Sequence, residues 1–468
     1  MTQKKTIFFS LAFPMSARNL LRNPFYEYLS SKYRIVIFSE FSRQEEFIKE
    51  FRRDETYFED LIFDPGKCRK SLIYKIHRWG DRYYFAQNKK VHGVYLNRVL
   101  YKSNWKEEKK TRIAGQLFTK FPKINMWMAN RCNEMLVSPY YIKKIEKYKP
   151  DVVFSSHVYA EQENQLLLNA KLKAIPTIGL IHSWDNITSK GRINVMPDKI
   201  VLWNEVMKEE MKCLYNGVID ENNIFPVGIP QHDYIFNDNW KEGRAKFLKK
   251  LGADPDRKTI VYVSRGLKYQ HYRERENLEV LIDGIAKNKF TRKSQLIIRE
   301  IAGVDRLMCR DAIGKKPHVI FDVPDVSHRP NSNKNNVWTC NPKSTYHLGN
   351  LLMHSDVIIN FGSTITIDSL YYDKPNIWAI YSPPKKYNKF IYGKIPDALR
   401  WSYIRPMVNL NAFAVPKEPK GLIPLINEAL DDPKLLSKQR NEVLKKYCPY
   451  RDGKAGLRIA EVIESAFN

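Results

Sequence analysis

One stretch of the chain joins a buried strand to a turn of small residues and a run of hydroxyl side chains, a pattern typical of phosphate binding. It is the segment SDVIINFGSTITIDSLYYDKP, residues 355–375. Val357 to Ile359 are β-branched, as expected for a parallel strand that is covered on both faces. The chain then turns at Gly362, and a helix is expected to follow. Backbone N–H groups and the positive end of the helix dipole would then face one anion.

Hydroxyl and carboxyl side chains after this turn extend the predicted site. Ser363, Thr364 and Thr366 supply hydroxyls at the start of the helix. Asp368 lies about one turn further along, where its carboxylate can accept hydrogen bonds from a ribose. An ordinary βαβ unit with a Ser/Thr cap explains the same pattern equally well.

A second polar loop, IHSWDNITSKG at residues 181–191, follows an apolar strand-like run. His182 and Asp185 form a titratable pair that can accept a proton, Asn186 offers hydrogen bonds, and Lys190 can meet a phosphate. So many polar groups directly after an apolar strand are costly unless they line an exposed site. The alternative is a buried tryptophan beside a histidine that is already hydrogen-bonded.

A third loop offers cations for a diphosphate. Ser264, Arg265 and Lys268 follow another predicted strand and combine a hydroxyl, a guanidinium and an amine around a flexible glycine. A structural ion pair is the other interpretation of Arg265.

Two weaker candidates lie nearer the N-terminus. His157 ends a predicted strand, so it should open on the same edge of a sheet as His182, although a capping role fits equally well. Arg18 and Asn19 follow the first predicted strand and would close over a bound substrate.

Size and composition describe a basic, globular protein. The chain has 468 residues and a formal net charge of +27, which favours an anionic partner such as nucleic acid, anionic lipid or a sugar nucleotide. The six cysteines stand singly, without the spacing of a disulfide framework or a zinc site. No uninterrupted apolar stretch approaches the roughly 20 residues of a membrane-spanning helix. The short apolar run before Pro14 is interpreted as a strand and not as a signal peptide.

Strand-like runs along the chain predict an α/β fold with two Rossmann-like, doubly wound domains that face a central cleft. The predicted strands cover residues 5–11, 34–38, 151–155, 177–182, 199–203, 259–264, 295–299, 319–323, 357–359 and 377–380. A helix is expected over 17–29. The polar segment 237–258 is the predicted boundary. We expect an N-terminal domain over 1–240, a C-terminal domain over 255–448, and a helix within 449–468 that packs back on the first domain.

The segment from Lys67 to Lys123 fits the βα rhythm poorly, because it mixes basic residues with many aromatic ones. One interpretation is a helical insert at the surface of an anionic membrane, where each basic residue contributes about 1 kcal/mol. A solvated helical face over buried aromatics is a second interpretation, and base stacking is a third.

Three motifs together resemble the GT-B glycosyltransferases. They are VGIPQHD at 227–233, the segment 355–375, and RDGK at 451–454. More narrowly, they are similar to the branch that includes CDP-glycerol glycerophosphotransferases and enzymes of bacterial surface polysaccharide synthesis. In that branch a histidine loop ends a strand of the first domain, as His182 does here.

This chain also departs from that branch. HSWDN stands where glycerophosphotransferases carry His-Gly-Thr-Pro, and NFGST stands in place of their Asp-Tyr-Ser-Ser. These differences favour a sugar over a polyol phosphate. Retaining GT-B enzymes often carry two glutamates, of which only the second has an acidic counterpart here, Asp368, so an inverting reaction is favoured.

The resemblance implies a metal-independent glycosyltransferase, without a cofactor, that moves a sugar from a nucleotide-sugar donor to a surface polysaccharide or lipid-linked glycan, as in capsule or lipopolysaccharide synthesis. We expect it to be cytoplasmic and peripheral on the inner face of the membrane. The expected roles are base for Asp185 or His182; donor binding for Ser264, Arg265, Lys268, Gly362, Ser363, Thr364 and Asp368; and acceptor binding for Arg18, Asn19, His157, Asn186 and Lys190. The alternatives are a CDP-polyol phosphotransferase of teichoic-acid type and a non-catalytic, basic protein that binds RNA or membranes.

Overall fold

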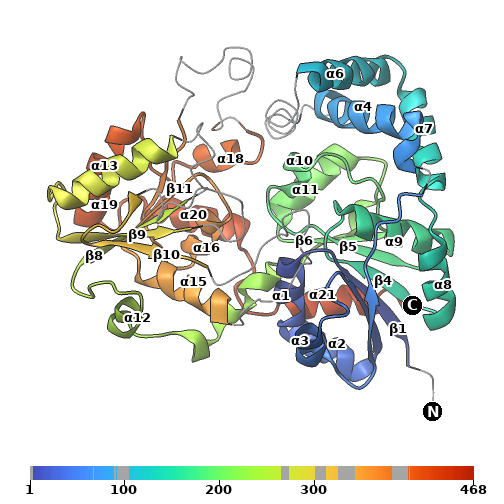
Figure 1. The fold of residues 1–468 in the computed structure, drawn as a ribbon, viewed down its shortest axis with the longest axis horizontal. Helices are drawn as coiled ribbons and strands as arrows, with labels where there is room; N and C mark the ends of the chain where they lie inside the picture. Colours follow the sequence, from blue (N-terminus) through green and yellow to red (C-terminus); the bar gives the residue numbers. More distant parts are fainter. Residues whose placement is uncertain are drawn as a thin grey trace. The chain divides into compact units, whose positions relative to one another are not determined.

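The protein is described by a computed structural model that covers residues 4–66, 68–88, 91, 105–264, 273–300, 313–324, 343–381, 399 and 401–467. It divides into two compact units: unit 1 is Met1–Asp233 with Tyr450–Asn468, and unit 2 is Tyr234–Pro449. Each unit is built on one parallel sheet with helices on both faces (Figure 1). The prediction of two doubly wound α/β domains is confirmed.

The sheet of unit 1 has the strand order β3-β2-β1-β4-β5-β6-β7. Its strands are β1 (Thr6–Leu11), β2 (Arg34–Ser39), β3 (Thr56–Asp60), β4 (Val152–Ser155), β5 (Thr177–Leu180), β6 (Lys199–Leu202) and β7 (Ile224–Pro226). After β1 the chain builds outward through β2 and β3, then returns to the other side of β1 with β4. The strand order therefore reverses between β1 and β4, and in open α/β sheets ligands bind at the carboxyl ends of the strands at such a point.

The sheet of unit 2 repeats this plan with fewer strands, in the order β10-β9-β8-β11-β12. The strands are β8 (Lys258–Val263), β9 (Ser294–Arg299), β10 (Val319–Asp322), β11 (Val357–Asn360) and β12 (Asn376–Trp378). Here the order reverses between β8 and β11. The segment that opened the sequence analysis thus lies at the switch point of unit 2.

All ten predicted strands are strands in the structure, whereas the two edge strands of unit 1 were not predicted. Both edge strands are poor in the usual signals: β3 reads TYFED and β7 is three residues long and ends in Pro226. The single helix expected over 17–29 is wrong. The chain forms α1 (Pro14–Leu21) and α2 (Pro24–Lys32) instead, because Asn23 caps a new helix that begins at Pro24.

Helices cover both faces of the two sheets (Figure 1). In unit 1 they are α3 (Glu45–Phe51), α8 (Pro139–Tyr148), α9 (Glu161–Leu172), α10 (Asn186–Ser189) and α11 (Glu205–Tyr215). In unit 2 they are α12 (Arg244–Lys250), α13 (Glu274–Ala286), α15 (Lys343–His354), α16 (Ile365–Leu370), α18 (Arg405–Val408), α19 (Leu422–Asp431) and α20 (Ser437–Tyr447). The segment 237–258 belongs to unit 2, where its Trp240 and Phe247 are buried.

The C-terminal helix α21 (Ala455–Glu464) packs on α2 in unit 1. The carboxylate of Asp233 accepts hydrogen bonds from the backbone N–H groups of Ala455 at 3.0 Å and Gly456 at 2.8 Å, and from Asn23 Nδ2 at 2.8 Å. A Cβ atom on Gly456 would lie 1.8 Å from Asn23 Oδ1, so only glycine fits there. The VGIPQHD motif therefore holds the end of the chain against unit 1.

A helical insert stands beside α10 and α11 in unit 1 (Figure 1). It consists of α4 (Leu72–Asn88), α6 (Trp105–Lys120) and α7 (Pro122–Glu134). The first two helices pack closely because each presents a glycine to an aromatic ring of the other. A Cβ on Gly80 would lie 2.5 Å from the Phe118 ring, and one on Gly115 would lie 2.2 Å from the Tyr83 ring.

Candidate functional site

The switch point of unit 1 is organised around one buried carboxylate, Glu163 of α9. Its side chain is fully buried, and every hydrogen bond given for it comes from a donor at the end of β1 or β4. The donors are Ser10 Oγ at 2.9 Å, Ala12 N at 2.8 Å, Ser155 Oγ at 2.8 Å, Ser156 Oγ at 2.9 Å and His157 N at 3.0 Å. Burial raises the pKa of Glu163, and the hydrogen bonds from Ala12 N and the three serines oppose that rise. One side chain therefore fixes the two loops at the switch point.

The loop after β4 carries His157 to the loop after β5. The ring centroids of His157 and His182 are 5.7 Å apart, with 33° between their planes. The His157 ring also contacts the Phe13 ring, at a centroid distance of 5.0 Å. Because Glu163 binds the backbone N–H of His157, it also holds this ring beside His182. Two of the predicted site residues therefore lie together.

Arg18 and Lys190 act on the same ring. Burial first, and then the charges of Arg18 and Lys190, lower the pKa of His182 to about 4, while Asp185 opposes the shift. The ring is therefore neutral near pH 7. Four residues from three separate segments thus form one group in unit 1, with two cations around a neutral imidazole.

Asp185 is half-buried just before the short helix α10, and its Oδ2 accepts a hydrogen bond from Ser189 Oγ at 2.9 Å. Asn186, which follows it, is 2% exposed. Asn19 is also buried, and its Oδ1 accepts from Arg18 Nε at 3.0 Å, so it orients that guanidinium. Acceptor binding by Asn19 and Asn186 stays a prediction.

A carboxyl that the sequence analysis did not select, Glu210 of α11, lies in the same region. Burial, and then the charge of Asp185, raise the pKa of Glu210 to about 8. A signal was present in the sequence: Glu210 stands three residues after Met207 and next to Met211, both buried, so helical spacing places it toward the apolar face.

The switch point of unit 2 is organised around a neutral amide, Asn360, the last residue of β11. Its Oδ1 accepts hydrogen bonds from Gly362 N at 2.8 Å, Ser363 N at 3.2 Å and Thr366 Oγ1 at 3.0 Å. Its Nδ2 donates to Asn376 Oδ1 at 2.6 Å. Gly362 has a φ of +65°, a conformation that glycine adopts without strain.

These contacts correct the prediction for the phosphate turn. The amides of Gly362 and Ser363 were expected to face an anion, but Asn360 already binds both. Thr366 was expected to offer a hydroxyl, but its side chain is fully buried between Asn360 and Trp378 Nε1, which donates to it at 3.1 Å. The two amides and the Thr366 hydroxyl therefore stabilise the turn itself and are not available to a ligand.

The outer part of the turn remains a candidate. Among the residues that the structure describes, none accepts a hydrogen bond from the N–H groups of Thr364 and Ile365. The side chains of Ser363 and Thr364 are half-buried, as is Asp368 on α16. Burial and then the Asp368 carboxylate raise the pKa of Tyr372, so these two groups lie near one another.

Ser264 ends β8 and is buried, with its N–H donating to Arg299 O at 2.9 Å, whereas Arg265 and Lys268 lie outside the described residues. Arg299 itself was not among the predicted site residues. Its guanidinium pairs with Asp322 at 2.5 Å, and His347 Nε2 lies 2.9 Å from the same carboxylate. Charged residues directly after the apolar runs of β9 and β10 were the available signal.

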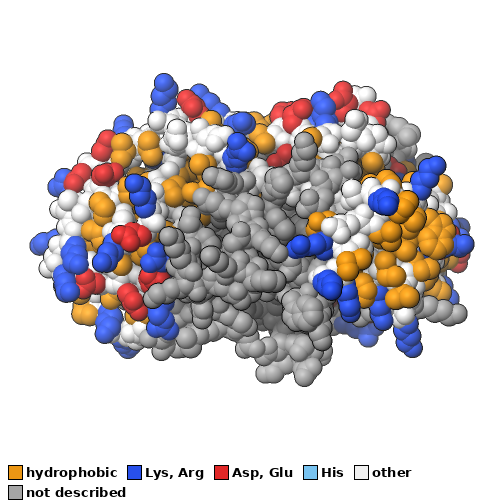
Figure 2. All heavy atoms as spheres, turned by 90° about the horizontal axis from the view of Figure 1, so that it is seen from above, with side chains coloured by type: hydrophobic (Ala, Val, Ile, Leu, Met, Phe, Trp, Pro, Cys, Tyr) orange, Lys and Arg blue, Asp and Glu red, His pale blue; other side chains and the backbone are white. Residues whose placement is uncertain are grey.

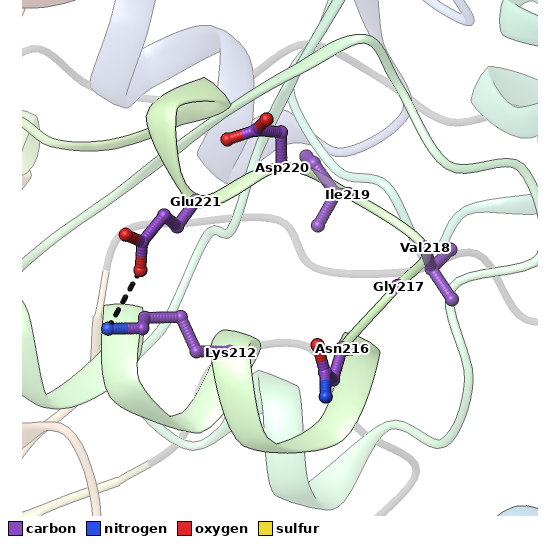
Figure 3. Close-up of a pocket in the computed structure, with 7 residues that line it drawn as sticks. All are labelled: Lys212, Asn216, Gly217, Val218, Ile219, Asp220 and Glu221. Atoms are coloured by element: carbon purple, nitrogen blue, oxygen red, sulfur yellow. Dashed lines mark ion pairs between the residues drawn. The ribbon is translucent and has the colours of Figure 1, made fainter.

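A surface pocket of about 420 Å³ lies elsewhere in unit 1 (Figure 3). It is lined by Lys212 and residues 216–221, between the end of α11 and the start of β7. Lys212 pairs there with Glu221 at 2.9 Å (Figure 3). Because the pocket lies toward the amino end of β7, it is at the opposite edge of the sheet from the loops that carry His157 and His182.

A family model described as CDP-Glycerol:Poly(glycerophosphate) glycerophosphotransferase matches residues 182–465, more than half of the chain. The chain belongs to this family. The match begins at His182 and includes Asp185, Glu210 and the turn after β11. A search of curated proteins finds no match.

Three solved structures share the fold. A putative UDP-N-acetylglucosamine 2-epimerase from Listeria monocytogenes has 13% identity and a TM-score of 0.56, over 100% of this chain and 97% of that chain. S. aureus MnaA in a co-structure with UDP has 12% identity and a TM-score of 0.55, over 98% and 96%. UDP-GlcNAc 2-epimerase from Neisseria meningitidis, bound to UDP-GlcNAc, has 12% identity and a TM-score of 0.55, over 98% and 100%.

Fold and family together describe the molecule as a GT-B-fold enzyme, a glycosyl or phosphoglycerol transferase related to the CDP-glycerol glycerophosphotransferases. The predicted fold class and the prediction of an enzyme are confirmed. The non-catalytic alternative is not favoured. Within the described residues, none of the helices has both the length and the apolar character needed to cross a membrane.

Proposed function

We propose that the protein is a metal-independent, inverting glycosyltransferase that moves a sugar from a nucleotide-sugar donor to a surface polysaccharide or lipid-linked glycan. The observation that carries this proposal is the group at the carboxyl ends of β4 and β5, where Asp185, His157 and His182 stand with Arg18 and Lys190. A carboxylate beside fixed cations suits the removal of a proton from an acceptor that is itself anionic. Two of the structural relatives are complexes with UDP and with UDP-GlcNAc, which supports a nucleotide-sugar donor.

In the proposed reaction the acceptor hydroxyl gives its proton to Asp185 while its oxygen bonds to the anomeric carbon. The bond between that carbon and the diphosphate oxygen breaks, and the nucleoside diphosphate leaves with the electron pair. Arg18 and Lys190 bind the acceptor. His182 is neutral and can exchange hydrogen bonds with it; the low pKa makes His182 the weaker candidate for the base.

We assign the donor to unit 2. The N–H groups of Thr364 and Ile365 and the hydroxyls of Ser363 and Thr364 would hold its phosphates, with Asp368 on the ribose. Asn360 supports this role indirectly, since it fixes the turn that presents these groups. Ser264, Arg265 and Lys268 remain the proposed partners of the leaving diphosphate.

Asp185→Asn tests the proposed base. It keeps the size of the side chain but cannot accept the acceptor's proton, so we expect turnover to fall by about two to four decades with donor binding retained. Turnover is measured by product formation and donor binding by thermal shift. Asp220→Asn, a carboxylate of the distant surface pocket, is the matched control. Unchanged turnover in Asp185→Asn would remove this residue from the mechanism.

Transfer of a polyol phosphate from a CDP-linked donor is the second candidate, and the description of the matching family supports it without favouring it over sugar transfer. The two reactions release different products. A glycosyltransferase leaves a nucleoside diphosphate and a glycosylated acceptor, whereas the phosphotransferase leaves CMP and a phosphodiester. Mass spectrometry of the products after incubation with both donor classes separates them.

We also propose that the helical insert rests on an anionic membrane surface. Large apolar side chains are exposed along α6 and α7, and they are Ile113, Leu117, Phe121, Ile124, Met126 and Trp127. Exposed basic residues interleave with them, and they are Lys109, Lys110, Arg112, Lys120 and Lys123. Figure 2 shows hydrophobic side chains gathered with Lys and Arg over this part of unit 1. Apolar side chains ringed by cations match the interface of an anionic bilayer.

Sedimentation with lipid vesicles tests this surface. Vesicles that contain phosphatidylglycerol should retain the protein, and neutral phosphatidylcholine vesicles should not. Replacing both Met126 and Trp127, which are 61% and 50% exposed, by serine should weaken retention about tenfold or more. Leu172→Ser, at a 57% exposed site on α9, is the matched control. Equal retention of all variants would contradict the proposed surface.

A further inference from the structure

Glu210 is a half-buried carboxyl that the proposed chemistry does not use. It lies on α11, which packs against α10 and so supports the loop that carries Asp185. Its Oε2 atom is buried, and no hydrogen-bond partner for it exists among the residues that the structure describes. Ionisation is costly there, because no described group replaces the water that Oε2 has lost.

Among the residues that the structure describes, the charged group that acts on Glu210 is Asp185, which adds no compensating positive charge. Asp185 acts on it from the loop before α10, and the Tyr159 hydroxyl from the loop after β4. Tyr215, on the same helix, lies next to Tyr159, and the charges of Arg192 and Asp81 act on the pKa of Tyr215. Arg192 is already paired with Asp81, at 3.1 Å. With one oxygen buried without a partner and a second carboxyl nearby, Glu210 keeps its proton.

We infer that Glu210 is a positioning residue of the candidate site: it stays protonated beneath the 182–190 loop, and its neutral state keeps Asp185 in place as the base. The part of this inference that concerns catalysis rests on the proposed function. Glu210 does not touch the reacting atoms, and its proton leaves only to solvent when the pH is raised. Ionised Glu210 would place a second negative charge beside Asp185 and repel it from its position.

Thermal stability as a function of pH tests the protonation without any substrate. The pKa of Glu210 is raised to about 8 from its usual 4.5, so its contribution to stability is full below pH 4.5 and is lost as the pH rises toward 8. Glu210→Gln keeps the shape but cannot ionise. The difference between the Tm of Glu210→Gln and that of the wild type should therefore increase by several °C in favour of the variant between pH 5 and pH 8. Above pH 8 the difference should stay constant.

Glu209→Gln is the matched control, because Glu209 is exposed on the same helix and pairs only with Lys212 at 3.1 Å among the described residues. Its Tm should run parallel to that of the wild type. If Glu210→Gln also runs parallel, Glu210 is not protonated and the inference is wrong, whatever the enzyme's reaction.

Activity tests the positioning role once a donor and an acceptor are in hand. The wild type should lose kcat/KM above about pH 8, and Glu210→Gln should not, while Glu210→Ala should lose about tenfold or more at every pH. An alkaline loss that is equal in wild type and Glu210→Gln would overturn the positioning role. Failure of the proposed function is a separate result, since it would show as full turnover in Asp185→Asn while the Tm comparison still holds.

Discussion

The switch points of the two units are built alike but use different chemistry. In unit 1 the loops are tied by Glu163, a carboxylate that reaches in from α9 and accepts five hydrogen bonds. In unit 2 they are tied by Asn360, an amide at the end of β11 that accepts three and donates one. A carboxylate only accepts hydrogen bonds, so its partners must all be donors. An amide also donates, and Asn360 Nδ2 donates to Asn376.

This difference agrees with the ligands proposed for each unit. A negative hub in unit 1 is compatible with the cations Arg18 and Lys190 near the acceptor. A negative hub beneath the turn of Ser363 and Thr364 would instead repel a phosphate, and Asn360 holds that turn without adding charge. The comparison therefore links the choice between carboxylate and amide to the charge of the substrate group above it.

Glu163→Ala should have the largest effect. It removes the acceptor of five hydrogen bonds and opens a cavity, so the free energy of unfolding of unit 1 should fall by about 4–5 kcal/mol. Calorimetry or urea titration followed by fluorescence measures the loss. Glu161→Ala, on the same helix and half-buried, is the control. A loss under about 1 kcal/mol would show that the switch point does not depend on the carboxylate.

Asn360→Ala should cost somewhat less, about 3 kcal/mol, because a neutral acceptor is lost from fewer donors. Asn360→Asp sharpens the comparison, since it keeps the acceptors for Gly362 and Ser363 but places a charge beneath them. Nucleotide binding to Asn360→Asp, measured by calorimetric titration, should weaken by at least about tenfold. Unchanged binding would mean that phosphate does not lie above this turn.

His182 should make the stability of unit 1 sensitive to acid. Its folded pKa of about 4 lies below the usual 6.5, so the unfolded state takes up a proton first and stability falls as the pH drops from 6.5 to 4. The loss amounts to about 2–3 kcal/mol. Denaturation at pH 7 and pH 4.5 should show a smaller acid loss in His182→Gln than in the wild type. An equal loss in both proteins would contradict the burial of the ring beside two cations.

Lys212→Ala should have the smallest effect. Lys212 lines the surface pocket of Figure 3 and pairs with exposed glutamates, so the variant should change stability by less than about 0.5 kcal/mol and leave turnover unchanged. Thermal unfolding and product formation measure both quantities. A clear loss of turnover would show that this pocket, and not only the switch points, takes part in the reaction.

Much of the fold was predictable because a buried parallel strand is a short apolar run that can be recognised from the local sequence alone. Runs such as Val357 to Ile359 need no distant information, and all ten predicted strands exist. The edge strands β3 and β7 were missed because edge positions do not require an apolar run. The break at Asn23 and Pro24 was readable from the sequence but was not used.

The sequence by itself determined which residues follow the strands: His157 after β4, His182 after β5 and the Gly362 turn after β11. Only the tertiary structure decided how those residues are used. Asn360 accepts hydrogen bonds from the amides that a ligand was expected to bind. Glu163 binds both Ser10, which lies 153 positions away along the chain, and His157, which lies 6 positions away. Burial and hydrogen-bond partners come from segments far apart in sequence, so the raised pKa of Glu210 and the lowered pKa of His182 follow from packing and not from any local pattern.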